Sequence, residues 1–140
     1  MKLISHRGNI DGPNIERENE PLYIFEALEK KFDVEIDVWW KENQFWLGHD
    51  KPQYCVKKEF LQNKKLWCHA KNIEALNKML EDKNIHCFFH QDDDVTLTSK
   101  GYIWTYPNQQ LTPKSIAVLP EEKINVKVAG ICSDFIMRIS

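Results

Sequence analysis

The strongest constraint on the fold is a series of short apolar segments that are separated by turn residues and are too short to be helices. Eight of them fit β-strands, at residues 3–6, 33–40, 65–71, 85–91, 95–98, 101–106, 115–119 and 130–135. Two further stretches have helical periodicity, 19–32 with Asn19 as the expected N-cap and 72–84 with Asn72 as the expected N-cap. The order strand, helix, strand predicts a parallel sheet with crossover connections.

We therefore expect an α/β fold, a reduced TIM-like (β/α) barrel with parallel strands and only two substantial helices. Eight strands match a closed barrel in number, but such barrels usually take about 250 residues, and this chain has 140. Most helices of the second half must then be loops, and an open parallel sheet is the alternative. The length and a hydrophobic content of 42% predict a single domain over residues 1–140.

Charge and hydropathy argue against two kinds of partner. The 19 Lys and Arg residues are interleaved with 21 Asp and Glu residues, so no basic stripe is present and nucleic acid is not expected to bind. No apolar run approaches the roughly 18 residues of a membrane span, and the N-terminus lacks the apolar core of a signal peptide. We therefore expect a cytoplasmic protein without a membrane span.

Ionisable side chains stand at or near the C-terminal ends of several expected strands, where the catalytic groups of parallel barrels lie. They are His6, Asp37, Lys71, His90 and Asp134. Because side chains alternate along a strand, Glu35 and Asp37 point to the same side of the sheet. Two inward carboxylates need a cation or basic partners, and a hard divalent metal such as Mg²⁺ or Ca²⁺ prefers oxygen ligands.

Each of these features, taken alone, also has a structural interpretation. The Glu35–Asp37 face could be a solvated outer face, and the acidic turn at 92–94 could be an ordinary surface loop. His69 and His90 could be core histidines that bind backbone groups. The aromatic residues near strand ends could stack on a sugar or glycerol group, or could simply fill the core. They are Trp39, Trp40, Trp104 and Tyr106.

The order and spacing of four short motifs are more specific than any one of them. They are His6-Arg7-Gly8, Glu18-Asn19, Glu35-x-Asp37 and His49-Asp50. This arrangement resembles the glycerophosphodiester phosphodiesterase family, within the superfamily of phospholipase-C-like phosphodiesterases. The similarity covers the first fifty residues well and the rest of the chain thinly.

The resemblance implies a metal-dependent phosphodiester hydrolase that cleaves a glycerophosphodiester or a similar small phosphodiester. Glu35 and Asp37 would hold the divalent metal, Mg²⁺ or Ca²⁺. His6 and His49 would act as the catalytic acid and base, without the sequence indicating which residue has which role. The substrate phosphate would be bound by Arg7 and Lys71.

The chain departs from the family pattern at the third strand. The family has a Glu two residues before a Lys, and this chain has His69 and Lys71. His69 itself, Asp92 or a water could replace the missing acid. Asp134 matches an Asp of the family's last strand, and His90 and Trp104 are additional candidate site residues.

Two alternatives remain open at this point. The chain could be a catalytically degenerate relative that binds a phospho-sugar or a lipid headgroup without turnover, and His69 is the feature that favours this interpretation. It could also be a homo-oligomer in which a second copy completes the barrel, because so few helices leave apolar sheet surface uncovered.

Overall fold

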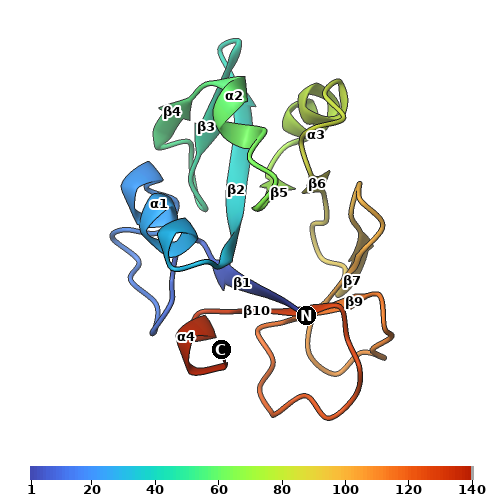
Figure 1. The fold of residues 1–140 in the computed structure, drawn as a ribbon. Helices are drawn as coiled ribbons and strands as arrows, with labels where there is room; N and C mark the ends of the chain where they lie inside the picture. The colour runs from blue at the N-terminus through green and yellow to red at the C-terminus, as the bar shows by residue number, and fades with distance from the viewer. Residues whose placement is uncertain (140) are drawn as a thin grey trace.

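The strands of the computed structural model, which describes residues 1–139, curl into an open half-barrel (Figure 1). Ser140, the last residue of the expected domain, lies outside the described residues. The strands are β1 (Lys2–His6), β2 (Asp33–Lys41), β3 (Gln44–Leu47), β4 (Tyr54–Val56), β5 (Leu66–Ala70), β6 (Cys87–Phe88), β7 (Val95–Leu97), β8 (Ile103–Thr105), β9 (Ser115–Val118) and β10 (Gly130–Ser133). The helices are α1 (Pro21–Glu29), α2 (Lys58–Leu61), α3 (Ile73–Leu80) and α4 (Ile136–Ile139).

The expectation of a reduced TIM-like barrel of parallel strands is wrong. The strands form one mixed sheet, in which β2–β3, β3–β4 and β7–β8 pair in antiparallel fashion. Within residues 1–139 no ladder joins β6 to β7, so the curled sheet stays open there. Hydrogen bonds between Cys87 and Ser99 cross this opening without forming a strand pair.

Turn chemistry accounts for much of the difference. Glu42 and Asn43 both have positive φ, 55° and 59°, as a two-residue type I′ hairpin turn requires. The chain therefore reverses after β2, and residues 44–47 form β3. In the second half, loops that contain Pro107, Pro113 and Pro120 take the place of crossover helices.

The two longer helices fall within the predicted stretches, but one cap is wrong. The Asn72 side chain accepts a hydrogen bond from the Ala75 amide and caps α3 as expected. The N-cap of α1 is Glu20 and not Asn19, whose side chain binds Asp37 instead. No helix in residues 1–139 has the length and apolar character needed to cross a membrane.

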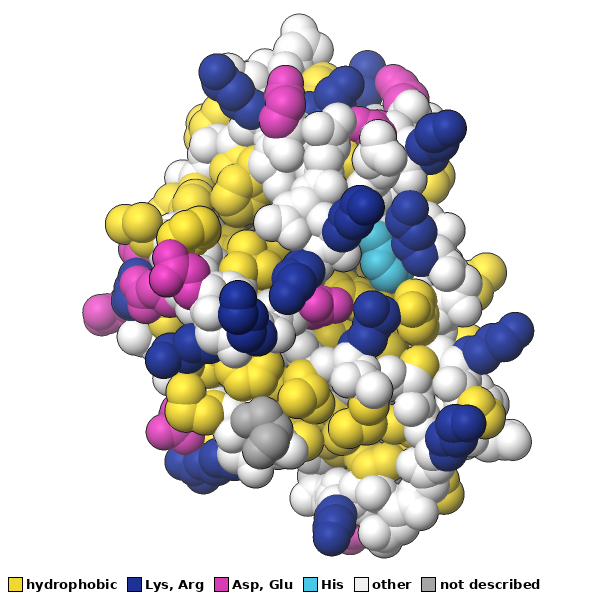
Figure 2. All heavy atoms as spheres, in the orientation of Figure 1, with side chains coloured by type: hydrophobic (Ala, Val, Ile, Leu, Met, Phe, Trp, Pro, Cys, Tyr) yellow, Lys and Arg dark blue, Asp and Glu magenta, His cyan; other side chains and the backbone are white. Residues whose placement is uncertain are grey.

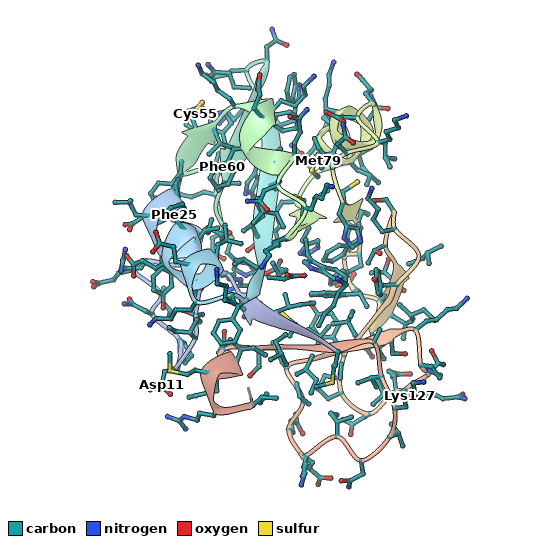
Figure 3. All side chains as sticks on the ribbon, in the orientation of Figure 1. Asp11, Phe25, Cys55, Phe60, Met79 and Lys127 are labelled. Atoms are coloured by element: carbon teal, nitrogen blue, oxygen red, sulfur yellow. The ribbon has the colours of Figure 1, made fainter. Side chains whose placement is uncertain are left out.

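The register of the parallel strands aligns the predicted site residues. In the β1–β2 ladder His6 lies beside Glu35, and in the β2–β5 ladder Asp37 lies beside His69. The predicted alternation along β2 is confirmed. Its apolar residues belong to one core cluster, here called the outer core cluster, which also contains residues of α1 and Met79 of α3 (Figure 3). Glu35 and Asp37 face the opposite side of the sheet.

The inner core cluster forms the floor beneath the site. Five of its members each precede a polar side chain of the site by two positions, at or just beyond the end of a strand. They are Ile4, Trp67, Phe88, Trp104 and Cys132, followed by His6, His69, His90, Tyr106 and Asp134. Trp104 is 1% exposed, so filling this core is its main role. Cys68, Cys87 and Cys132 are buried free thiols.

Candidate functional site

A cavity of about 250 Å³ opens at the C-terminal ends of the parallel strands. Predicted site residues that line it are His6, Arg7, Glu35, His49, His69, Lys71, His90 and Trp104. On the face of the molecule drawn in Figure 2, Lys or Arg side chains lie among Asp or Glu and apolar side chains, and one histidine is visible. Asp37 is fully buried behind this lining and contacts three of its members, Arg7, His49 and His69.

Two buried carboxylates occupy the centre of the site. Glu35 is 3% exposed and Asp37 is 0% exposed, and Glu35 Oε1 and Asp37 Oδ1 accept no hydrogen bond within residues 1–139. Burial and the charge of Asp37 raise the pKa of Glu35 well above its usual range. Burial alone would also raise the pKa of Asp37, but contacts with His49, His69 and Arg7 hold it well below its usual range. An additional positive charge would stabilise both carboxylates in their ionised form.

The residues present fit a divalent metal. Glu35, Asp37 and His69 each offer one donor atom, and the three atoms lie within 4.8 Å of one another. His69 Nδ1 is 3.3 Å from Asp37 Oδ1 and 3.9 Å from Glu35 Oε2. The structure thus places His69 beside the two carboxylates, whereas Asp92 is exposed outside the cavity. Two unpartnered carboxylate oxygens and an imidazole nitrogen are a common ligand set for a divalent ion.

His6 is held in one orientation by Asp134. Its Nδ1 lies 2.7 Å from Asp134 Oδ1, and its Nε2 lies 3.8 Å from Glu35 Oε1. Although burial acts to raise it, the pKa of Asp134 is lowered by the hydrogen bonds from His6 and Asn9, so this carboxylate is ionised at neutral pH. We assign the Nδ1 proton of His6 to the bond with Asp134, which leaves Nε2 facing the cavity for proton transfer.

Arg7 reaches two carboxylates from a turn. Its Nε forms an ion pair with Asp37 Oδ2 at 3.1 Å, and its Nη1 donates to Glu18 Oε1 at 3.2 Å. Burial acts to lower the pKa of Arg7, but the charges of Asp37, Glu35 and Glu18 outweigh it and raise the pKa. Its backbone has φ 60°, and the next residue, Gly8, has φ 98°, so the strand ends in a tight turn that aims the guanidinium along the cavity wall.

Asn19 of the Glu18-Asn19 motif holds Asp37 in place by two hydrogen bonds. The Asn19 side-chain amide donates to Asp37 Oδ2 at 2.9 Å, and its oxygen accepts the Asp37 backbone N–H at 2.9 Å. Asn19 has φ 66° and is fully buried. Its side chain therefore fixes a carboxylate of the site, and this use explains why it does not cap α1.

His49 lies at the rim of the cavity, with its side chain 41% exposed. Its Nδ1 is 3.6 Å from Asp37 Oδ2 and its Nε2 is 3.5 Å from Arg7 Nη2. Trp39 Nε1 donates to the Gly48 carbonyl at 2.6 Å and ties the loop that carries His49 to β2. Trp39 and Trp40 do not line the cavity, so the expected stacking of these two residues on a ligand is not supported.

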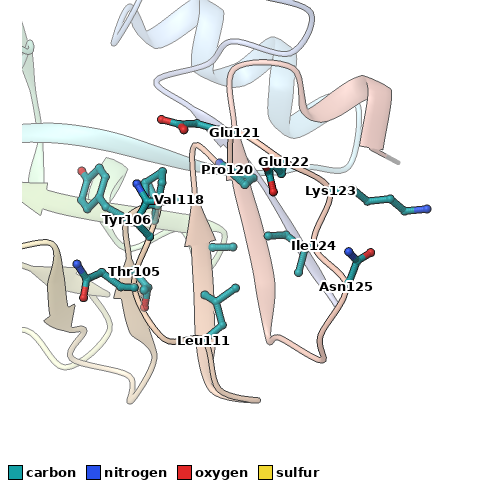
Figure 4. Close-up of a pocket in the computed structure, with 14 residues that line it drawn as sticks. Thr105, Tyr106, Leu111, Val118, Pro120, Glu121, Glu122, Lys123, Ile124 and Asn125 are labelled. Carbon is teal, nitrogen blue, oxygen red and sulfur yellow. The ribbon is translucent and has the colours of Figure 1, made fainter.

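The remaining wall is aromatic. The His90 ring stacks on the His69 ring with a centroid distance of 4.4 Å, and the Tyr106 hydroxyl lies 3.3 Å from His90 Nε2. Burial is the main cause that lowers the pKa of His90 to about 4, so its ring is neutral at pH 7. Tyr106 also borders a neighbouring cavity of about 250 Å³ between the loops after β8 and β9 (Figure 4).

Sequence reasoning missed Asn9, which is fully buried. Its amide nitrogen donates at 2.9 Å both to Glu18 Oε2 and to Asp134 Oδ1. Its oxygen accepts hydrogen bonds from the Asn14 N–H and the Tyr23 hydroxyl. Asn9 therefore links the partner of His6 to the partner of Arg7. Its place directly after the His-Arg-Gly motif was the only available signal, because a loop residue has no periodicity.

Comparisons with known proteins add no family assignment. No protein-family model matches the chain, and the searches of curated proteins and of solved structures gave no significant match.

Proposed function

We propose that this chain is a metal-dependent phosphodiester hydrolase that cleaves a glycerophosphodiester or a similar small phosphodiester. The observation that carries the proposal is the gathering of three kinds of group around one cavity. Two carboxylates with unpartnered oxygens lie at its wall or directly behind it, four histidines including His6 and His49 line it, and two cationic side chains line it. A metal, a proton donor and acceptor, and anion-binding groups are what in-line phosphodiester cleavage needs.

Substrate binding falls to the cation-rich wall. A divalent ion held by Glu35, Asp37 and His69 would polarise a phosphoryl oxygen and lower the pKa of a nearby hydroxyl. Arg7 offers Nη2 to the phosphate, because its Nε and Nη1 contact Asp37 and Glu18, and Nη2 has only the 3.5 Å contact with His49 Nε2. The Lys71 ammonium adds a second positive charge to the lining where negative charge develops on the phosphorus oxygens.

The two histidines would carry the protons. One accepts the proton of the attacking hydroxyl as the new P–O bond forms, and the other donates a proton to the leaving alcohol oxygen as the old P–O bond breaks. Attack by a neighbouring substrate hydroxyl gives a cyclic phosphodiester and a free alcohol, and attack by water gives a phosphomonoester and the alcohol. His6 suits either role, because Asp134 fixes its tautomer and stabilises the imidazolium.

One feature favours a second candidate function, the binding of a phospho-sugar or lipid headgroup without turnover. His69 stands where the resemblance leads us to expect an acid, which leaves two carboxylates rather than three in the candidate metal group. A weaker metal site would still permit Arg7 and Lys71 to hold a phosphate. The two functions use the same cavity and differ in whether a P–O bond is broken.

Turnover of bis(p-nitrophenyl) phosphate separates them. The purified chain is assayed with EDTA and then with Mg²⁺, Ca²⁺ or Mn²⁺, and we expect turnover only with metal. His6→Ala and His49→Ala should each lose at least about a hundredfold in kcat, since general acid–base catalysis contributes roughly 10²–10⁴-fold. Asp92→Asn, at an exposed position outside the cavity, is the matched control and should keep full activity.

Two results would count against the enzyme. Full activity of His49→Ala contradicts the acid–base pairing. Absence of metal-dependent turnover in the unmodified chain contradicts hydrolysis, and calorimetric binding of glycerophosphocholine by that same chain would then support the binding function.

A further inference from the structure

A separate cavity of about 540 Å³, here called the basal cavity, opens at the opposite end of the strands. Its residues come from the starts of strands or from the loops that lead into them, and they include Lys2, Asp33, Lys64, His86, Lys100 and Tyr102. The proposed hydrolase site lies at the other ends of these strands, so its chemistry does not account for the basal cavity.

The lining of the basal cavity has an excess of positive charge. Lys2, Lys64 and Lys100 stand against one carboxylate, Asp33, which already accepts a hydrogen bond from Trp67 Nε1 at 3.0 Å. No ion pair joins any of the three lysines to a carboxylate within residues 1–139, and Lys100 Nζ donates only to the Lys83 carbonyl. The chain as a whole has a net charge of -2, so composition does not explain this excess.

Another large cavity of the molecule provides a contrast. The cavity beside Trp40 is lined by three lysines, but they are matched by three acidic residues. Its charged residues are Lys57, Lys58, Lys78, Glu59, Glu81 and Asp82. The lysines of the cavity beside Trp40 are therefore balanced by acidic residues, whereas the lysines of the basal cavity are not.

Aromatic rings form one wall of the basal cavity. The Trp67 ring packs on His86 and Tyr102 with centroid distances of 4.3 and 4.9 Å, and His86 Nε2 lies 2.8 Å from Thr98 Oγ1. Burial, followed by the charges of Lys100 and Lys2, lowers the pKa of His86 to about 4. Both lysines line the same cavity as this ring. A weakly polar wall strengthens the attraction between the ammonium groups and any anion that enters.

We propose that the basal cavity binds a small polyvalent anion of the pyrophosphate type. Three ammonium groups without carboxylate partners supply the charge, since lysine binds phosphate groups as a point charge. Tyr102 and Asn84 also line the cavity, and the Tyr102 hydroxyl and the Asn84 side-chain amide donate no hydrogen bond within residues 1–139, so both groups could bind anion oxygens. The site is independent of the proposed hydrolase activity.

Calorimetric titration with inorganic pyrophosphate, in EDTA and without divalent metal, tests the proposal. We expect one anion to bind at the basal cavity, with an affinity that falls as salt is added. The triple variant Lys2→Gln/Lys64→Gln/Lys100→Gln should bind at least about tenfold more weakly, because it removes the three positive charges that would contact the anion. The matched control Lys57→Gln/Lys58→Gln/Lys78→Gln removes the same charge from the balanced cavity and should keep the affinity.

The variant Lys71→Gln distinguishes the two ends of the molecule. Pyrophosphate binding that survives in Lys71→Gln and is lost in the basal triple variant supports the proposal. Binding that is lost in Lys71→Gln and kept in the basal triple variant assigns the anion to the hydrolase cavity and overturns it. Equal loss in both lysine triple variants, or no binding by the unmodified chain, also overturns it.

Discussion

Replacing Asn9 by Asp should destabilise the protein, although the two side chains have nearly the same size. The fully buried Asn9 amide donates to Glu18 Oε2 and to Asp134 Oδ1, both at 2.9 Å. An Asp side chain retains the two acceptor contacts, with the Asn14 N–H and the Tyr23 hydroxyl, but loses both donors. It also places a third carboxylate against two others.

The magnitude follows from those two bonds. A hydrogen bond to a charged group is worth about 1.5–3 kcal/mol, so the loss of both costs at least about 3 kcal/mol before like-charge repulsion is added. Folded domains have roughly 5–15 kcal/mol of stability in total, so the variant should fold with a strongly reduced margin. Tyr23→Phe is the matched control, because it removes one neutral bond to the same Asn9 and should cost about 1 kcal/mol.

Urea unfolding followed by tryptophan fluorescence measures both variants, at pH 7 and at pH 5. Crowded carboxylates in the folded Asn9→Asp protein should have raised pKa values, so the folded state binds more protons than the unfolded state. The deficit relative to the unmodified chain should therefore shrink as pH falls, whereas that of Tyr23→Phe should stay constant. A deficit of Asn9→Asp no larger than that of Tyr23→Phe, or one that grows in acid, would refute the role assigned to Asn9.

Three further outcomes are expected. Gly8→Ala should lower the urea midpoint, at a cost of roughly 1–3 kcal/mol, because φ is 98° and an added Cβ would lie 2.6 Å from the Tyr23 ring. Arg7→Lys should weaken competitive inhibition by inorganic phosphate, since one ammonium cannot replace both the two carboxylate contacts and the phosphate contact proposed for Nη2. Stability should fall as pH drops from 6.5 to 4, because unfolded His86 takes a proton near pH 6.5 and folded His86 near 4. His86→Gln should remove this pH-dependent loss, which is about 3 kcal/mol of unfolding free energy at pH 4. Urea midpoints of the variant and of the unmodified chain measure the difference.

The local features of β2 could be predicted because they depend on strand periodicity alone. Alternation places Glu35 and Asp37 on one face, and the ladder with β5 then sets Asp37 beside His69. The sequence shows Glu18-Asn19 as a motif, but it does not predict the turn that brings Asn19 into contact with Asp37.

The arrangement of the sheet could not be predicted in the same way. Whether β2 reverses into β3 depends on positive φ at Glu42 and Asn43, and neither residue is the glycine that usually signals such a turn. Closure between β6 and β7 depends on pairing between segments that are both very short. Apolar runs of this length show that strands form, but they do not specify which neighbours pair.

The most direct test of the metal-dependent site is a crystal structure with Mn²⁺ and inorganic phosphate, read from the anomalous difference map. We expect one strong peak within ligand distance of Glu35, Asp37 and His69, with the phosphate between that peak and Arg7. A map with no Mn²⁺ in this cavity at millimolar metal, or with the ion bound away from both carboxylates, would contradict the proposed metal site.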